Sequence, residues 1–301
     1  MLKPLRLIGY AILAGLLATG CETPIEIDLP EHRQVAVIEG WIENGQPAIV
    51  AMSISRPYYS TTSMDSILKS IQTNAKVTVT DSNTGESEQL TLGKTNDHIY
   101  GVLGKTYIGK SLKGVPGHTY LLHVENNGSH YDASTKIPQH GVRLDSLYFS
   151  RKGRSFIRIL FTDHAGEFNC YRFLTKVKGQ EPTFTQVYIG TFDDLTFDGK
   201  QLNFELTRMP YSNLLGIEYK TLEDLKNATM FKRGDVVYVK STTTDPATKD
   251  FWFALQMDLA MTNNMIVSPG VYKTNIRESE GRTVSGIWSG YHARYDTIVC
   301  R

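Results

Sequence analysis

Three features are scarce in this 301-residue chain: cysteine, long hydrophobic segments and an excess of charge of either sign. Its cysteines are Cys21, Cys170 and Cys300, and in an oxidising compartment the last two could form a disulfide or remain two buried thiols. A membrane-spanning helix needs about 20 apolar residues, and we expect no such span after the N-terminal segment. The 32 basic and 31 acidic residues give no indication of nucleic-acid binding.

The sequence also lacks the motifs of common enzyme classes. It has no G-x-S-x-G nucleophile motif, and its eight histidines do not follow the H-E-x-x-H metal spacing. Cys170 has His164 nearby, but no thiol-protease pattern surrounds it. The segment Gly104–Ser111 matches the P-loop consensus, yet the LKGVPG that follows cannot form the helix that a P-loop needs. We therefore expect a protein that is not an enzyme and that uses no cofactor.

Acidic residues at short spacing give one weak indication of a metal site. Asp193, Asp194 and Asp198 could offer oxygen ligands to Ca²⁺. The EF-hand spacing is absent, however, and Asp198 precedes Gly199 in a dipeptide that is typical of hairpin turns. We predict a turn here and no metal site.

The N-terminus has the features of an export signal. Lys3 and Arg6 precede an apolar run of about eleven residues, which is too short to span a bilayer. Small residues then lead to Cys21, in a pattern that resembles the bacterial lipobox: Ala18, Thr19 and Gly20. The resemblance implies cleavage before Cys21 and a lipid on its thiol; the alternative is a plain signal peptide with a chance cysteine. Acyl chains contribute about 0.8 kcal/mol per buried methylene, so two or three would hold the chain on a membrane.

After this signal peptide (residues 1–20) and an acidic tether (residues 21–31), the sequence has the pattern of β-strands. Asn44-Gly45 separates two apolar runs, and this dipeptide is a strong signal for a tight hairpin. Alternating apolar residues in NAKVTVTDS and TYLLHVEN indicate further strands, with a second turn at Asn127-Gly128. We assign residues 32–138 to an N-terminal β-sandwich.

The second half of the chain repeats this pattern and adds one helix. Strands are indicated by RLDSLYFS, SFIRILFTD, YRFLTKVK, TQVYIGTF and GDVVYVKSTT. The segment near residues 247–262 lacks glycine and proline, and Trp252, Leu255 and Leu259 would share one helix face. We therefore predict an all-β protein with two immunoglobulin-like β-sandwich domains, of which the second, residues 139–301, carries this packed helix.

Several stretches resemble, in the same order, the DUF4249 family of Bacteroidetes outer-membrane lipoproteins. They cover most of the chain after the signal: CETPIEIDLPE, VIEGWIENGQPAIVAMSISRPY, GVPGHTYLLHVENNGSHYDASTKIP, FKRGDVVYVKSTT and SPGVYKTNIRESEGRTVSGIWSGY. The resemblance implies a lipid-anchored protein of the outer membrane, often encoded beside a TonB-dependent transporter of the SusC type. Acidic residues after Cys21 resemble the surface-export signals of such lipoproteins. The resemblance implies no catalytic residues.

Two further groups of residues are candidate sites. Short D-[ST]-apolar patterns resemble the O-glycosylation sites of exported Bacteroidetes proteins, with Ser66, Ser146 and Thr297 as acceptors. Tyr58 and Tyr59 lie in a polar stretch that we expect to be a loop. Aromatic side chains there either contact a ligand or partner, or pack on the edge of the domain.

Together these features predict a lipid-anchored accessory or binding subunit that works with a SusC-type TonB-dependent barrel in ligand capture or gating. A surface adhesin or structural module that binds a partner protein is the main alternative. A surface hydrolase fits less well, because no nucleophile and base stand at a recognisable spacing. The predicted contacts are the outer membrane through the lipid on Cys21 and the barrel, with no nucleic acid.

Overall fold

The fold is built mainly from β-strands. The computed structural model describes residues 33–57, 63–150, 156–208, 221–261 and 272–301. Strands and their turns make up most of this part, so the predicted all-β, sandwich-type fold is confirmed. Residues 34–301 form one compact unit. None of the helices in the described part is long and apolar enough to cross a membrane.

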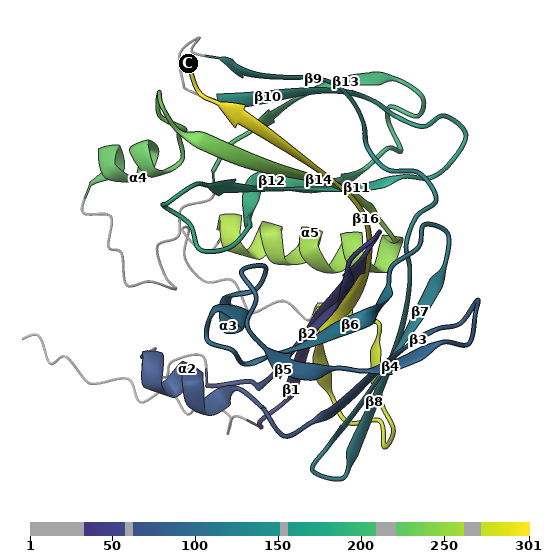
Figure 1. Cartoon of the computed structure of the whole chain (residues 1–301). Coiled ribbons are helices and arrows are strands. Elements are labelled where there is room, and N and C mark those ends of the chain that lie inside the picture. The colour runs from purple at the N-terminus through teal and green to yellow at the C-terminus, as the bar shows by residue number, and fades with distance from the viewer. Residues whose placement is uncertain (1–32, 58–62, 151–155, 209–220, 262–271) are drawn as a thin grey trace, which may run out of the picture. The chain divides into compact units, whose positions relative to one another are not determined.

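The largest sheet has eight strands and includes both early and late parts of the chain (Figure 1). Across this sheet the order is β12 (Thr185–Asp193), β11 (Cys170–Val177), β14 (Val236–Thr244), β16 (Val284–Val299), β1 (Ala36–Glu43), β2 (Pro47–Ile54), β6 (Thr106–Lys113) and β5 (Thr91–Gly93). β16 pairs in parallel with β1 and antiparallel with β14, so the last strand lies at the centre of the sheet.

Two smaller sheets pack on this large one. The five-stranded sheet has the order β15 (Ile276–Glu278), β8 (Ser129–Lys136), β7 (Thr119–Asn126), β3 (Lys76–Asp81) and β4 (Ser87–Gln89). The three-stranded sheet has the order β13 (Gln201–Leu206), β10 (Phe156–Thr162) and β9 (Arg143–Ser150). The predicted turns are present: Asn127 and Gly128 join β7 to β8 with φ of 50° and 79°, the positive values that such tight turns require.

Each small sheet encloses a separate hydrophobic core. Successive side chains of a strand point to opposite faces, and the register places both cores on the same face of the eight-stranded sheet. The first core includes Ile38, Val79, Tyr120 and Trp288, and the second includes Ile159, Phe173 and Val239. Trp288 is fully buried and donates from Nε1 to the carbonyl oxygen of Tyr120 (2.9 Å), which ties β16 to the five-stranded sheet.

The predicted boundary between two sandwich domains, at residues 138 and 139, does not divide the large sheet, which contains strands from both sides of it. The cores do change near this point, but β16 supplies Val284 and Trp288 to the first core and continues beside β14 of the second. In Figure 1 this long strand, in yellow, passes from one group of strands to the other. Gly286, with φ of 105°, faces the backbone of Ile38, where any side chain would collide. The two halves therefore share one continuous sheet.

The predicted helix is confirmed as α5 (Pro246–Met261). Asp245 caps its first turn, because its carboxylate accepts hydrogen bonds from the backbone N (2.9 Å) and the hydroxyl (3.0 Å) of Thr248. The predicted apolar face is only partly correct: Trp252 and Leu255 are half-buried, whereas polar Gln256 is more deeply buried. The sequence pattern predicts one helix, whereas the described residues also contain three short ones: α2 (Met64–Ser70), α3 (Ile99–Val102) and α4 (Leu222–Ala228).

Candidate functional site

The face of the eight-stranded sheet opposite the two cores carries charged and aromatic side chains. Lys240 on β14 and Glu43 on β1 form an ion pair whose side chains are only 8% and 4% exposed. The hydroxyl of Tyr295 donates to the second oxygen of Glu43 (2.5 Å). Lys240 Nζ also lies 5.4–5.9 Å from the ring centroids of Trp41, Tyr291 and Tyr295, within the range of cation–π attraction. The lysine is thus enclosed by aromatic rings and one carboxylate.

This arrangement continues under α5 through Arg172 on β11. The guanidinium carbon of Arg172 lies 3.7 Å from the ring centroid of Trp252, and its Nη1 donates to the hydroxyl of Tyr291 (2.9 Å). Two buried donors, Arg172 Nε and Trp252 Nε1, have no acceptor among the described residues. We call Lys240, Arg172 and the residues that contact them the helix-side cluster: Trp41, Glu43, Arg172, Lys240, Trp252, Tyr291 and Tyr295.

Glu39 lies beside the helix-side cluster and is 38% exposed. Its carboxylate is 3.4 Å from Nε2 of His98. Burial raises the pKa of Glu39, but the contact with His98 and the charge of Arg172 outweigh this effect, so the pKa is lowered overall. Glu39 therefore carries a negative charge at neutral pH, beside buried cationic and aromatic side chains of the helix-side cluster.

Beside this cluster, α5 and the edge strand β12 carry a set of exposed apolar residues. They are Tyr188 (43% exposed), Ile189 (58%), Phe253 (43%) and Met257 (37%). The helix is fixed to the strand by Gln256, whose Oε1 accepts from the backbone N of Gly190 (2.8 Å) and of Thr191 (3.1 Å). We call these four residues the edge strip. Exposed aromatic and aliphatic groups beside a sheet edge are typical of a surface that contacts another molecule.

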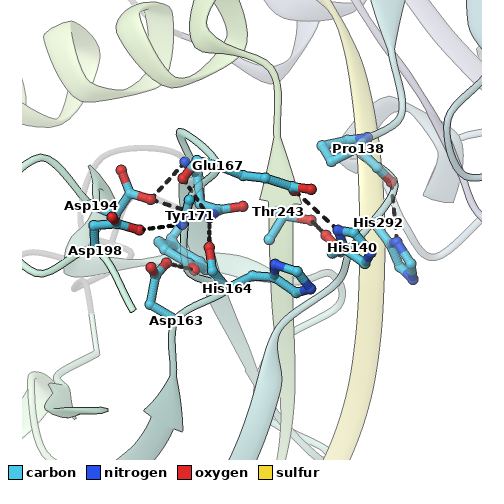
Figure 2. Close-up of polar contacts among 12 residues, drawn as sticks. Pro138, His140, Asp163, His164, Glu167, Tyr171, Asp194, Asp198, Thr243 and His292 are labelled. Carbon is cyan, nitrogen blue, oxygen red and sulfur yellow. Dashed lines mark hydrogen bonds and ion pairs between the residues drawn. The ribbon is translucent and has the colours of Figure 1, made fainter. Parts of the chain in front are cut away.

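A second group of side chains lies between the β8–β9 segment and the β10–β11 loop (Figure 2). The imidazole rings of His140 and His164 stack with centroids 3.8 Å apart and planes 12° apart. Glu167 Oε2 is 3.0 Å from His140 Nδ1, and this hydrogen bond lowers the pKa of Glu167. We call His140, His164 and Glu167 the histidine–glutamate cluster. The sequence analysis did not predict it, because its members come from two separate loops.

Three carboxylates gather on the other side of the same loop, at the left of Figure 2: Asp163, Asp194 and Asp198. Each already accepts a hydrogen bond. Asp163 accepts from Tyr171 and from the N of Gly199, Asp194 from Asn169 N and Asp198 from Gly166 N. Burial and the charge of Asp163 raise the pKa of Asp194 despite its bonds to Asn169. These carboxylates therefore order the loops around them.

The aspartates considered for Ca²⁺ are only partly brought together. Asp194 and Asp198 belong to the group of three carboxylates, but Asp193 lies outside it and forms an ion pair with Lys249 (3.0 Å). The turn predicted at Asp198-Gly199 is present, with φ of 67° at Gly199.

Several predicted site residues lie outside the described residues. These are the lipobox positions Ala18, Thr19, Gly20 and Cys21 and the candidate contacts Tyr58 and Tyr59. Lipidation of Cys21 and contact through the two tyrosines stay predictions.

The three candidate O-glycosylation residues occupy different environments. Thr297 is exposed on β16, and Ser146 is half-buried on β9. Ser66 lies in the first turn of α2, where it forms a capping box with Ser63 and accepts a hydrogen bond from Arg56. Modification needs an accessible hydroxyl, and Thr297 is the most exposed of the three residues. Glycosylation at all three positions stays a prediction.

Cys170 and Cys300 are both buried and free, so no disulfide joins them. Cys170 is opposite Thr244 at one end of β14, whereas Val299, next to Cys300, is opposite Val236 at the other end. Eight residue steps of about 3.3 Å separate these ends by roughly 26 Å. A disulfide requires Cα atoms no more than about 7 Å apart. The alternative of two buried thiols is the correct one.

Sequence reasoning missed the helix-side cluster, although one signal was visible. Lys240 interrupts the strand VVYVKSTT, and a lysine among buried strand residues needs a charged partner. Its partner Glu43 is the last residue of the apolar strand β1 and precedes Lys240 by 197 residues in the sequence. Nothing local to either position indicates that the two strands lie in one sheet.

Comparison with known proteins places the chain in a family by its sequence. No curated protein matches it. The family model described as a domain of unknown function, DUF4249, matches residues 22–294, which is nearly the whole chain after the N-terminal segment. The resemblance found in the sequence is therefore confirmed, and the chain belongs to the DUF4249 family.

Proposed function

We propose that this chain is a lipid-anchored accessory subunit of the outer membrane that works with a SusC-type TonB-dependent transporter in ligand capture or gating. The lipobox-like residues before Cys21 support the anchor, and membership of the DUF4249 family supports the association. The protein would act at the membrane surface by holding its folded unit beside the barrel.

The observation that carries this proposal is the edge strip. Tyr188 and Ile189 project from an edge strand, and Phe253 and Met257 stand one turn apart on α5. A monomeric protein in water usually keeps such groups apart, and aromatic anchors at the centre of a patch carry much of the affinity of protein interfaces. Exposed aromatic and aliphatic side chains suit a protein partner better than a small polar ligand.

The reactive groups of the described part also favour binding over catalysis. Burial raises the pKa of the Cys170 thiol to about 12, so this cysteine is not a thiolate nucleophile at neutral pH. Lys240 is held as an ion pair with Glu43. These features support a protein that is not an enzyme.

The test is affinity purification of the tagged chain from detergent-solubilised outer membranes, followed by mass spectrometry. We expect a TonB-dependent barrel in stoichiometric amount. Ile189→Asp and Phe253→Asp place a charge in the edge strip and should each reduce the recovered barrel about tenfold or more, as expected for loss of an interface anchor. Leu121→Asp is the matched control, because Leu121 is as exposed as Phe253 (43%) but lies on β7.

Other outcomes would point elsewhere. Recovery of the lipoprotein alone, from membranes in which a barrel is intact, would contradict the proposal. Recovery of a different surface protein would favour the adhesin or structural module. Circular dichroism of each variant shows whether a lost partner reflects the interface or a lost fold.

A further inference from the structure

We propose that His140, His164 and Glu167 form a binding site for a divalent transition-metal ion of the Zn²⁺ type. One nitrogen from each imidazole and one carboxylate oxygen lie within 4.8 Å of one another. Two histidines and one glutamate are a ligand set that Zn²⁺ uses in proteins, with a fourth position open to water or to another ligand.

The distances between these two nitrogens and one oxygen are close to those of atoms bound to the same metal ion. Zn²⁺ binds nitrogen and oxygen ligands at about 2.0–2.2 Å, so two ligand atoms on one ion cannot be more than roughly 4.4 Å apart. The three atoms are therefore close to the spacing that one ion requires, although their present orientation does not yet aim them at one centre. The nitrogen donors favour Zn²⁺ or a similar ion over Ca²⁺, which takes oxygen ligands.

Binding requires the two histidine rings to turn. The lone pair of an imidazole nitrogen lies in the plane of its ring, and the stacked rings of His140 and His164 are almost parallel. An ion between them would lie outside both planes, so the rings must open like a hinge to bind it. The side chains have the freedom to do so: His140 is 39% exposed, Glu167 is 47% exposed and His164 is exposed.

The backbone that carries the ligands is already ordered. The side-chain nitrogen of Asn169 donates to the carbonyl oxygens of His164 (2.9 Å) and Glu167 (3.0 Å), which fixes the loop between them. The carbonyl oxygen of His140 accepts from the hydroxyl of Thr243 on β14 (2.6 Å), as Figure 2 shows. The entropy lost on binding is therefore mainly that of three side chains.

The ligands come from two segments that join different sheets. His140 lies between β8 of the five-stranded sheet and β9 of the three-stranded sheet, and His164 and Glu167 lie between β10 and β11. A bound ion would link these segments, so it would stabilise the folded chain in proportion to the logarithm of its concentration over Kd. The neighbouring carboxylates Asp163, Asp194 and Asp198 are not part of the proposed site.

The test uses the full chain, purified in detergent, freed of metal with a chelator and titrated with Zn²⁺ by calorimetry. We expect one saturable site and a higher midpoint of thermal unfolding with Zn²⁺. Co²⁺ in its place should give the visible absorption bands of an ion with nitrogen ligands. His164→Ala and Glu167→Gln should each weaken binding about tenfold or more.

The matched control is His130→Ala. His130 also stacks on a second histidine, His123, with centroids 5.8 Å apart, but this pair lies on the five-stranded sheet. Zn²⁺ binding that is absent, or that is unchanged by His164→Ala and Glu167→Gln in folded variants, would overturn the proposal, as would an equal loss in His130→Ala. The measurement needs no barrel, so its outcome is independent of the proposed transporter association.

Discussion

Lys240 lies in an environment that a lysine side chain seldom occupies. Its ammonium group is buried with the carboxylate of Glu43 among three aromatic rings. Removing two charges from water is costly, and their attraction offsets this cost only when both partners are present. We therefore expect the pair to favour the correct pairing of β14, β16 and β1 more than to add net stability.

We expect Lys240→Met to lower the free energy of unfolding by about 3–5 kcal/mol, because it leaves the Glu43 carboxylate buried without its partner. The double variant Lys240→Met, Glu43→Gln removes both charges and should recover most of the loss. Urea unfolding of Lys240→Met, Glu43→Gln, the double variant and the unchanged chain measures the coupling between the two residues. If the loss in the double variant equalled the sum of the losses in the two single variants, the two residues would not be coupled.

At the end of strand β15, the carboxylate of Glu278 forms an ion pair with the guanidinium group of Arg282. The Glu278 side chain is 1% exposed and accepts from Arg282 at 2.7 Å and 3.2 Å. The hydrogen bonds and charge of Arg282 lower the pKa of Glu278 from its ordinary 4.5 to about 2. A carboxyl group whose pKa is lower in the folded state stabilises that state above its unfolded pKa, and this stabilisation is lost as pH falls through the folded pKa.

The stability contributed by Glu278 should therefore be complete above pH 4.5 and disappear between pH 4.5 and pH 2. Glu278→Gln should be less stable than the unchanged chain at neutral pH, and the difference should shrink across this window. Urea unfolding at a series of pH values measures it. Glu280→Gln is the control, because that side chain is 67% exposed and 3.4 Å from Arg282; a difference that did not change with pH would contradict the assignment.

For the folded unit of residues 34–301, the decisive element is the last strand. β16 pairs with β1 through its first half and with β14 through its second, and Trp288 fills the core of the five-stranded sheet. The first half of the chain therefore has an incomplete core without β16, which follows it by almost 150 residues in the sequence.

We expect a fragment of residues 34–138 not to fold alone, although the sequence pattern assigns it to a separate domain. Without β16 it loses Val284 and Trp288 from its core and exposes the edge of β1. Circular dichroism and thermal unfolding of this fragment, beside residues 34–301, provide the measurement. A cooperative unfolding transition of the fragment alone would show that the shared sheet is dispensable.

Local features of the fold could be read from the sequence because their causes are local. Alternating apolar residues predicted the strands, Asn127-Gly128 predicted the β7–β8 turn, and a run without glycine or proline predicted α5 within one residue at each end. The series of short stretches was enough to identify the family. The candidate contacts at Tyr58 and Tyr59 came from composition, and the edge strip at Ile189 and Phe253 came only from the structure.

The sequence by itself determined the class of fold, the turns, the long helix and the family, because each depends on neighbouring residues or on an ordered series of them. Only the tertiary structure decided that both halves share one sheet, that Cys170 and Cys300 are far apart, and that Lys240 meets Glu43. The same holds for the meeting of His140 with His164 and Glu167. These features depend on which distant strands pair, and that choice is made by the burial of side chains from the whole chain at once.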